Sequence, residues 1–257
     1  MSRGLGDVYK RQVSPSPDNN LIAFTEDNNG RRQYDIKFLD PITLDITNPK
    51  IDDASGNIIW SKNNKHIVYL KKDPETLISN SVYVHTIGTS SSKDKLIYQE
   101  LDPEYNIDIS RSKSKKYVYI NVEATNDNEI YLVDLDDPIA KPMLFLKRST
   151  DHLYYLEHVD GEIFYVRTNI NAPNFKVLKV NSLSQIDLKN ADVIVEHNEN
   201  IFISDLLSLE NTLILEIREN GLPEIEIVDI SNQQRNRLEY ANNCLLYTSD
   251  AADEDLR

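Results

Sequence analysis

The chain has 257 residues, of which 40% are hydrophobic, and its 42 acidic and 28 basic side chains give a formal net charge of -14. This length is enough to bury a substantial core in one large domain or two small ones. The acidic balance argues against a nucleic acid or an anionic membrane surface as partner, because both would repel the chain. Solubility alone would also explain the excess of carboxylates.

Targeting signals and disulfides are not indicated. No apolar run reaches the roughly eighteen residues that a membrane span needs, and residues 1–12 lack the apolar segment of a secretory signal. The single cysteine, Cys244, cannot form a disulfide within the chain. Together these features favour the reducing cytoplasm.

The two ends of the chain correspond to related DNA. Residues 7–12 can be encoded by GATGTGTATAAGAGACAG, and the reverse complement of that string, read from its second base, encodes residues 244–249. The string resembles the transposase adapter used to build sequencing libraries. We therefore predict that residues 1–12 and 244–257 are translated adapter. Residues 13–243 would then be an internal fragment, and Cys244 would not be native.

Between these ends, short alternating stretches rich in Ile, Val, Tyr and Phe predict one strand after another. An incomplete unit is expected first, over residues 13–46. The second unit is expected to contain Asn57–Ser61, His66–Leu70, Ser81–His85 and Lys95–Gln99. The third is expected to contain Ile107–Ser110, Tyr117–Val122, Glu129–Asp134 and Met143–Leu146. Two further units follow at about 153–196 and 201–240.

The spacing of comparable strands is regular. Five strands begin at residues 21, 66, 117, 162 and 212, so successive starts are 45, 51, 45 and 50 residues apart. A period of this size is typical of the four-stranded blades of a β-propeller. The sequence thus predicts an all-β propeller with four full blades and part of a fifth. A β-sandwich or a meander is the competing interpretation, but neither predicts this period.

Serine-nucleophile chemistry finds no support in the motifs. An α/β-hydrolase places its serine in Gly-x-Ser-x-Gly, because the strained turn tolerates only small neighbours. No two of the seven glycines bracket a serine in that way. Ser90-Ser91-Ser92 is expected at a polar hairpin tip, with no base placed to activate it.

Metal and carboxylate chemistry is also weakly supported. His152 and His158 are six residues apart and would share one face of a strand, so a metal pair is conceivable, but a strand edge and a blade turn also explain them. Glycosidase carboxylates face each other across a cleft, whereas neighbours on a strand, such as Asp52-Asp53 and Asp136-Asp137, would point to opposite faces. These pairs are therefore expected to be turn residues. We predict no catalytic, cofactor-binding or metal-binding residue in the chain.

Set in order, the interior resembles the propeller of the oligopeptidase B branch of the prolyl oligopeptidase family of serine peptidases. The resemblance extends collinearly over essentially all of residues 13–243. The matching stretches are Ser16–Asn19, Arg31–Tyr34, Ile87–Thr89, Asp94–Tyr98, Phe145–Leu146, Asp151–His152, Leu156–His158 and Asn174–Phe175.

The resemblance implies a seven-bladed propeller that caps an α/β-hydrolase domain located later in the sequence. The Ser-Asp-His triad would lie wholly in that missing C-terminal domain, so no catalytic residue maps onto this chain. It also implies a parent enzyme that hydrolyses short peptides after Arg or Lys, with the propeller restricting access to the active site. The negative charge would then help to attract short cationic peptides.

Two other function classes remain open from the sequence. A free-standing propeller could serve as a binding scaffold, and a stop codon soon after ring closure would indicate it. A propeller enzyme with a metal in its channel would need a ring of His, Asp and Glu, which the sequence does not show.

Overall fold

The structure, a computed structural model, describes residues 9–27, 30, 32–73, 75–184 and 186–238. In these residues it contains nineteen β-strands, one short 3₁₀ helix, η1 (Ser91–Lys93), and no α-helix. None of the described residues forms a helix of the length and hydropathy that crossing a membrane requires. The chain divides into two compact units, Met1–Asp151 and His152–Arg257, which are considered separately.

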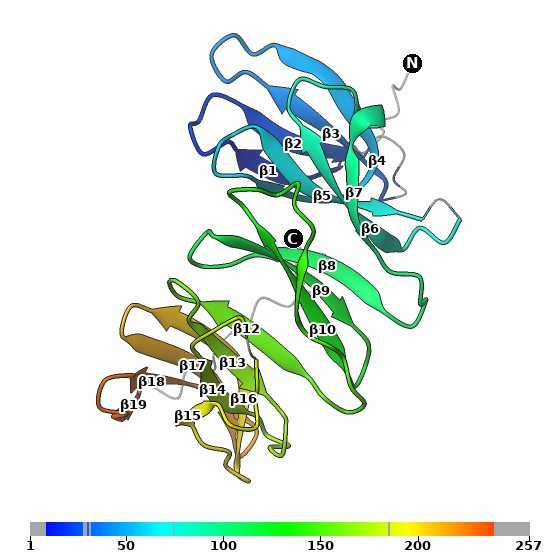
Figure 1. The fold of residues 1–257 in the computed structure, drawn as a ribbon. Helices are drawn as coiled ribbons and strands as arrows, with labels where there is room; N and C mark the ends of the chain where they lie inside the picture. Colours follow the sequence, from blue (N-terminus) through cyan, green and yellow to red (C-terminus); the bar gives the residue numbers. More distant parts are fainter. Residues whose placement is uncertain (1–8, 28–29, 31, 74, 185, 239–257) are drawn as a thin grey trace, which may run out of the picture. The chain divides into compact units, whose positions relative to one another are not determined.

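Three blades make up the first unit (Figure 1). Blade 1 consists of β1 (Tyr9–Pro15), β2 (Ile22–Asp27), β3 (Tyr34–Leu39) and the first part of β4 (Ile46–Trp60). Blade 2 consists of the rest of β4 with β5 (His66–Lys72), β6 (Ser79–Thr86) and β7 (Lys95–Gln99). Blade 3 consists of β8 (Asn106–Arg111), β9 (Tyr117–Glu123), β10 (Asn128–Asp134) and β11 (Met143–Leu146).

Two blades make up the second unit. Blade 4 consists of β12 (Tyr154–His158), β13 (Phe164–Thr168), β14 (Lys176–Val180) and β15 (Asp192–Val195). Blade 5 consists of β16 (Ile201–Leu209), β17 (Thr212–Glu219), β18 (Leu222–Asp229) and β19 (Arg235–Arg237). Every blade is an antiparallel meander in chain order. The prediction of an all-β propeller is confirmed, and the five strands that set the period are the second strands of the five blades.

Strand β4 belongs to two blades at once. It pairs with β3 from Ile46 to Ala54 and with β5 at Ile58–Trp60, and its register shifts between Ala54 and Ile58. Gly56, with φ of 103°, lies in this irregular stretch, where a residue without a Cβ is favoured. Because β4 also supplies the outer strand of blade 1, the unit expected to be incomplete has strands at all four positions.

The ends predicted to be translated adapter lie mostly outside the described residues, and Cys244 lies outside them entirely. Strand β1 begins at Tyr9, so the last four residues of segment 1–12 are in a strand. The adapter origin stays a prediction. Native codons at these positions in the parent gene would contradict it.

A repeated serine turn joins the first and second strands of blades 1, 2 and 3. The serines are Ser16, Ser61 and Ser112, whose spacing reproduces the first two strand periods, and all three are buried. Each serine accepts a hydrogen bond through Oγ from the N–H five residues later, at 3.0 Å in every case. Its own N–H donates to the carbonyl of that same later residue, at 2.8–2.9 Å. The first hydrogen-bonded pair of each hairpin is therefore fixed.

We expect Ser61→Ala to lower the free energy of unfolding by about 1–2 kcal/mol, because it leaves the His66 N–H without its Oγ acceptor in a buried turn. Urea unfolding measures this change. Lys65→Ala, an exposed position in the same turn, is the matched control and should change stability by less than about 0.5 kcal/mol. Equal stability of the two variants would contradict the role of the buried hydroxyl.

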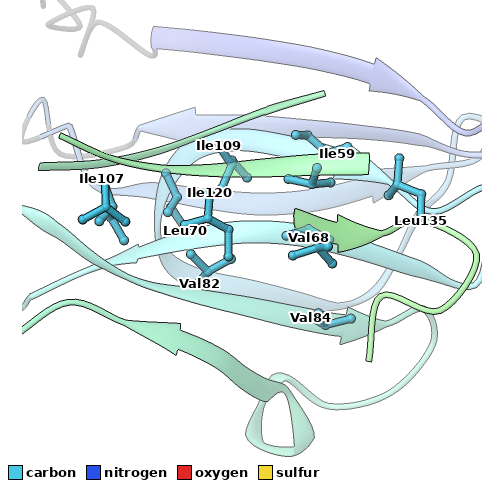
Figure 2. Close-up of a cluster of buried hydrophobic side chains, with 12 residues drawn as sticks. Ile59, Val68, Leu70, Val82, Val84, Ile107, Ile109, Ile120 and Leu135 are labelled. Atoms are coloured by element: carbon cyan, nitrogen blue, oxygen red, sulfur yellow. The ribbon is translucent and has the colours of Figure 1, made fainter. Parts of the chain in front are cut away.

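The hydrophobic core lies between neighbouring blades. Between blades 2 and 3, one cluster joins residues such as Val68, Leu70 and Val82 to Ile107, Ile109 and Ile120 (Figure 2). A second cluster joins blade 1 to blade 2 and contains Ile36, Ile58 and Trp60. In the second unit, a third cluster joins blade 4 to blade 5. Burial of these faces is the main favourable term that holds adjacent blades together.

Candidate functional site

The first strands of blades 1, 2 and 3 line a groove of about 330 Å³. In a propeller the blades surround a central channel. The lining residues are Gln12 and Ser14 from β1, Asn57, Ile58, Ile59 and Trp60 from β4, and Ile109, Ser110 and Arg111 from β8. This groove combines main-chain groups, two amides and one guanidinium on β-strands, so it is a candidate for binding in the first unit.

Hydrogen bonds between side chains and main chain connect β1 to β4 across the groove. The Gln12 amide contacts Ile58 twice: Oε1 accepts from the Ile58 N–H at 2.7 Å, and Nε2 donates to the Ile58 carbonyl at 3.2 Å. The Trp60 indole N–H donates to the Ser14 carbonyl at 3.0 Å. Blades 1 and 2 are thus held in register at the groove.

Between β4 and β8 the connection is of a different kind. The Asn57 amide nitrogen donates to Asp108 Oδ1 at 2.7 Å. Arg111, which lines the groove, and Asp108, which lies on the same strand outside the lining, are both exposed. These groups can bind polar or charged ligands, but they include no nucleophile with an adjacent base.

The serines at 90–92 form the start of η1 and its N-cap. The Ser90 and Ser92 hydroxyls lie 2.9 Å apart and share a hydrogen bond with each other. Ser92 is exposed, and no base contacts it. The structure therefore places these serines at the polar tip that the sequence indicated.

The two histidines considered as a metal pair have separate partners. His152 Nε2 lies 2.9 Å from Thr168 Oγ1, and burial lowers its pKa below the ordinary value. His158 Nε2 lies 3.2 Å from the Gly161 carbonyl oxygen. Across the described ranges, no three His, Cys, Asp or Glu side chains gather as a metal-binding group.

The paired aspartates are exposed, but only Asp136-Asp137 lie in a turn as expected; for Asp52-Asp53 the prediction of a turn is wrong, because β4 continues through them. Lys50 Nζ contacts Asp52 at 2.6 Å and Asp35 at 2.8 Å. Asp136 pairs with Lys62 at 2.9 Å, which links the turn of blade 2 to blade 3. Neither pair lines the groove.

Sequence reasoning missed a buried polar triplet in blade 2. Asp94 Oδ1 lies 2.7 Å from His85 Nδ1, and Asp94 Oδ2 accepts from the Tyr69 hydroxyl at 2.7 Å. Burial, and then the bond to Asp94, raise the pKa of Tyr69 above its ordinary value, so its hydroxyl stays protonated and donates. The His85 ring stacks on Phe38, and its buried Nε2 has no hydrogen-bond partner. The triplet resembles a catalytic dyad only in composition, because no hydroxyl reaches that nitrogen.

A second buried network joins blade 2 to the chain that follows β11. Arg148 Nη1 contacts Glu100 Oε2 at 3.0 Å, and its guanidinium lies 3.7 Å from the centre of the Tyr105 ring. The Arg148 N–H also donates to Glu129 at 3.2 Å. The Tyr98 hydroxyl donates to Glu100 at 2.9 Å. The guanidinium of Arg148 thus pairs with buried Glu100, while the main-chain N–H of the same residue binds buried Glu129.

The chain is similar to known proteins over most of its length. Residues 6–255 match the family model described as "Prolyl oligopeptidase, N-terminal beta-propeller domain". Dipeptidyl aminopeptidase BI of Pseudoxanthomonas mexicana is 33% identical over 219 residues, which are 83% of this chain and 29% of that protein. Protease 2 of Moraxella lacunata is 27% identical over 213 residues, 82% of this chain and 30% of that protein.

Solved structures share the fold. Oligopeptidase B from Leishmania major superposes with a TM-score of 0.84 at 23% identity, covering 92% of this chain and 34% of that one. Oligopeptidase B from Trypanosoma brucei, with covalently bound antipain, gives 0.83 at 22% identity over 93% of this chain and 34% of that one. The chain therefore spans about a third or less of the length of the proteins it matches.

Proposed function

The chain belongs to the prolyl oligopeptidase family, whose N-terminal β-propeller domain it contains, and from this premise we propose that it restricts access to the active site of a serine oligopeptidase. The observation that carries the proposal is the match over residues 6–255 in a chain that spans about a third or less of its relatives. Catalysis would belong to a C-terminal α/β-hydrolase domain. The propeller would admit short peptides and exclude folded proteins.

Cleavage after Arg or Lys is the specificity that we propose for the parent enzyme. The family branch that the sequence resembles supports it, as do the similarities to proteins named oligopeptidase B. The net charge of -14 supports it as well, because an acidic surface raises the local concentration of cationic peptides. Since salt screens this attraction, its contribution to the rate can be separated from that of specific recognition of the Arg or Lys side chain.

The proposal is tested by recovering the gene beyond residue 243 and expressing the full-length protein. We expect a downstream Gly-x-Ser-x-Gly motif and hydrolysis of blocked Arg and Lys dipeptide substrates at least about tenfold faster, in kcat/KM, than of an Ala substrate. A folded protein containing exposed Arg and Lys should remain intact. Cleavage of that protein, or a stop codon soon after ring closure, would contradict the proposal.

Salt dependence tests the role of charge. Raising the salt concentration should lower kcat/KM for the Arg and Lys substrates and leave an uncharged substrate unaffected. An unchanged rate would show the negative charge to be incidental.

We also propose a cytoplasmic location, which the single cysteine and the family resemblance support.

A further inference from the structure

The first strand of each blade has one edge that pairs with no strand of its own blade. In blades 2 and 5, groups of the preceding blade form hydrogen bonds with that edge. In blade 2 the Gln12 amide binds both the N–H and the carbonyl of Ile58. In blade 5 the Ile203 N–H donates to the Asn174 carbonyl at 3.0 Å, and the Ile203 carbonyl accepts from Arg167 at 3.0 Å. Both isoleucines therefore have their outward-facing main-chain groups satisfied.

The serine turns explain why Ile58 faces outward. The bond from the Ser61 N–H to the His66 carbonyl marks a hydrogen-bonded pair, and such pairs alternate along an antiparallel ladder. Ile58 lies opposite Tyr69, three pairs further on, so it exchanges no bonds with β5 and its main-chain groups point to the free edge.

The same construction makes Ile109 of blade 3 face outward. The Ser112 N–H donates to the Tyr117 carbonyl at 2.9 Å, and Ile109 lies opposite Ile120, again three pairs further on. Its N–H and carbonyl therefore point away from β9, toward the groove that Ile109 lines. Arg111, two residues along the strand, has the same orientation.

The residue that would cover Ile109 is too short to do so. Gln12 precedes its serine by four residues, and Asn57 precedes Ser61 by four, so Asn57 occupies the equivalent position in the next blade. Both lie in an irregular stretch of their strand. Asn57 lacks one methylene of glutamine, and its amide binds Asp108 instead. Within the described residues, no side chain or main-chain group bonds the outward N–H and carbonyl of Ile109.

We propose that an extended peptide segment binds in this groove by pairing antiparallel with β8 at Ile109. One peptide residue would donate its N–H to the Ile109 carbonyl and accept from the Ile109 N–H, as the Gln12 amide does at Ile58. Pairing through the main chain gives affinity without demanding a particular sequence, which suits a channel that admits varied peptides. The groove, about 330 Å³, is at the lower end of the roughly 300–1,000 Å³ of small-ligand sites. This inference deepens the proposed function and names a contact for the peptide.

The decisive variant of the 257-residue chain is Asn57→Gln. Its side chain has the length of Gln12, so its amide should bind the N–H and carbonyl of Ile109 and leave no room for a peptide there. The matched variant is Asn57→Ala, which leaves the edge open and widens the groove. The probe is acetyl-Thr-Val-Thr-Val-Thr-amide, an uncharged peptide without aromatic groups. Binding is measured by calorimetry and by the fluorescence of Trp60, which lines the groove and is the sole tryptophan of the chain.

We expect saturable binding to the unmodified chain, binding at least as tight to Asn57→Ala, and binding at least about tenfold weaker to Asn57→Gln. Equal affinity for Asn57→Gln and the unmodified chain would overturn the proposal, as would no binding at about 1 mM probe. Sedimentation without probe covers a second occupant: a dimer that Asn57→Gln dissociates would mean that another copy, not a peptide, pairs with β8.

This experiment measures binding without hydrolysis, so its result is independent of the proposed function. If the full-length protein fails to cleave Arg and Lys peptides while the probe still binds as described, the peptide contact stands and the enzymatic proposal does not. If cleavage occurs and the probe does not bind, the reverse holds.

Discussion

Replacing Asp94 by alanine should lower the free energy of unfolding by about 3 kcal/mol. The side chains of His85 and Asp94 are 0% and 1% exposed, so the removal of the carboxylate leaves the His85 Nδ1 and the Tyr69 hydroxyl without their partner in a dry interior. The three groups come from β5, β6 and the turn before β7, so we expect the unfolding of blade 2 as a whole to become less cooperative. Urea unfolding followed by far-UV circular dichroism measures the change.

Two variants separate the triplet from its surroundings. Tyr69→Phe removes one hydrogen bond and retains the ring, so it should cost only about 1–1.5 kcal/mol. Lys93→Ala, at an exposed position in η1 next to Asp94, should have almost no effect. If Asp94→Ala were no more destabilising than Lys93→Ala, the triplet would not contribute to stability.

Replacing Arg148 by methionine should cost about 3 kcal/mol at pH 7, because the buried carboxylate of Glu100 would lose its cation. Loss of the stacking on Tyr105 adds to the effect. Lys147→Met, at the exposed neighbouring position, is the matched control. The double variant with Glu100→Gln should recover part of the loss, since it removes the unpaired charge.

The same network predicts a pH dependence. Burial raises the pKa of Glu100, but hydrogen bonds from the Asp102 N–H, Arg148 and Tyr98 outweigh it and hold the pKa below its usual value. The folded state therefore favours ionised Glu100, and this stabilisation is present at neutral pH and lost as the pH falls through the lowered pKa. In Arg148→Met the burial effect is less opposed, so the variant should lose less stability than the unmodified chain on acidification. Parallel pH profiles for the two proteins would contradict this assignment.

The strand pattern was predictable because it depends on local sequence. The alternation of apolar residues located the second strand of every blade, since such a strand is buried on both faces or half-buried along its length. The length of β4 was not predictable, because Pro49 and Gly56 are typical of turns, yet the strand continues through both as it passes between blades. The serine turns were available as a repeat at 16, 61 and 112, and they would have fixed the phase of the blades.

The polar contacts required tertiary structure. His85 and Asp94 are close in sequence, but Tyr69 joins them from another strand, and Arg148 lies 48 residues from Glu100. Gln12 lies in the segment that the sequence predicts to be translated adapter, so the sequence gives no reason to expect its contact with Ile58. Such contacts depend on how separate hairpins stack, which no local pattern encodes.

The continuity of β4 also constrains how the first unit can open. Blades that are joined only by loops can separate by breaking side-chain contacts, whereas blades 1 and 2 share an unbroken backbone ladder from β1 to β7. Their separation would require the rupture of main-chain hydrogen bonds along β4. Blades 1 and 2 are therefore expected to move and unfold as one rigid block, and local opening in this unit would begin at the loop between β7 and β8.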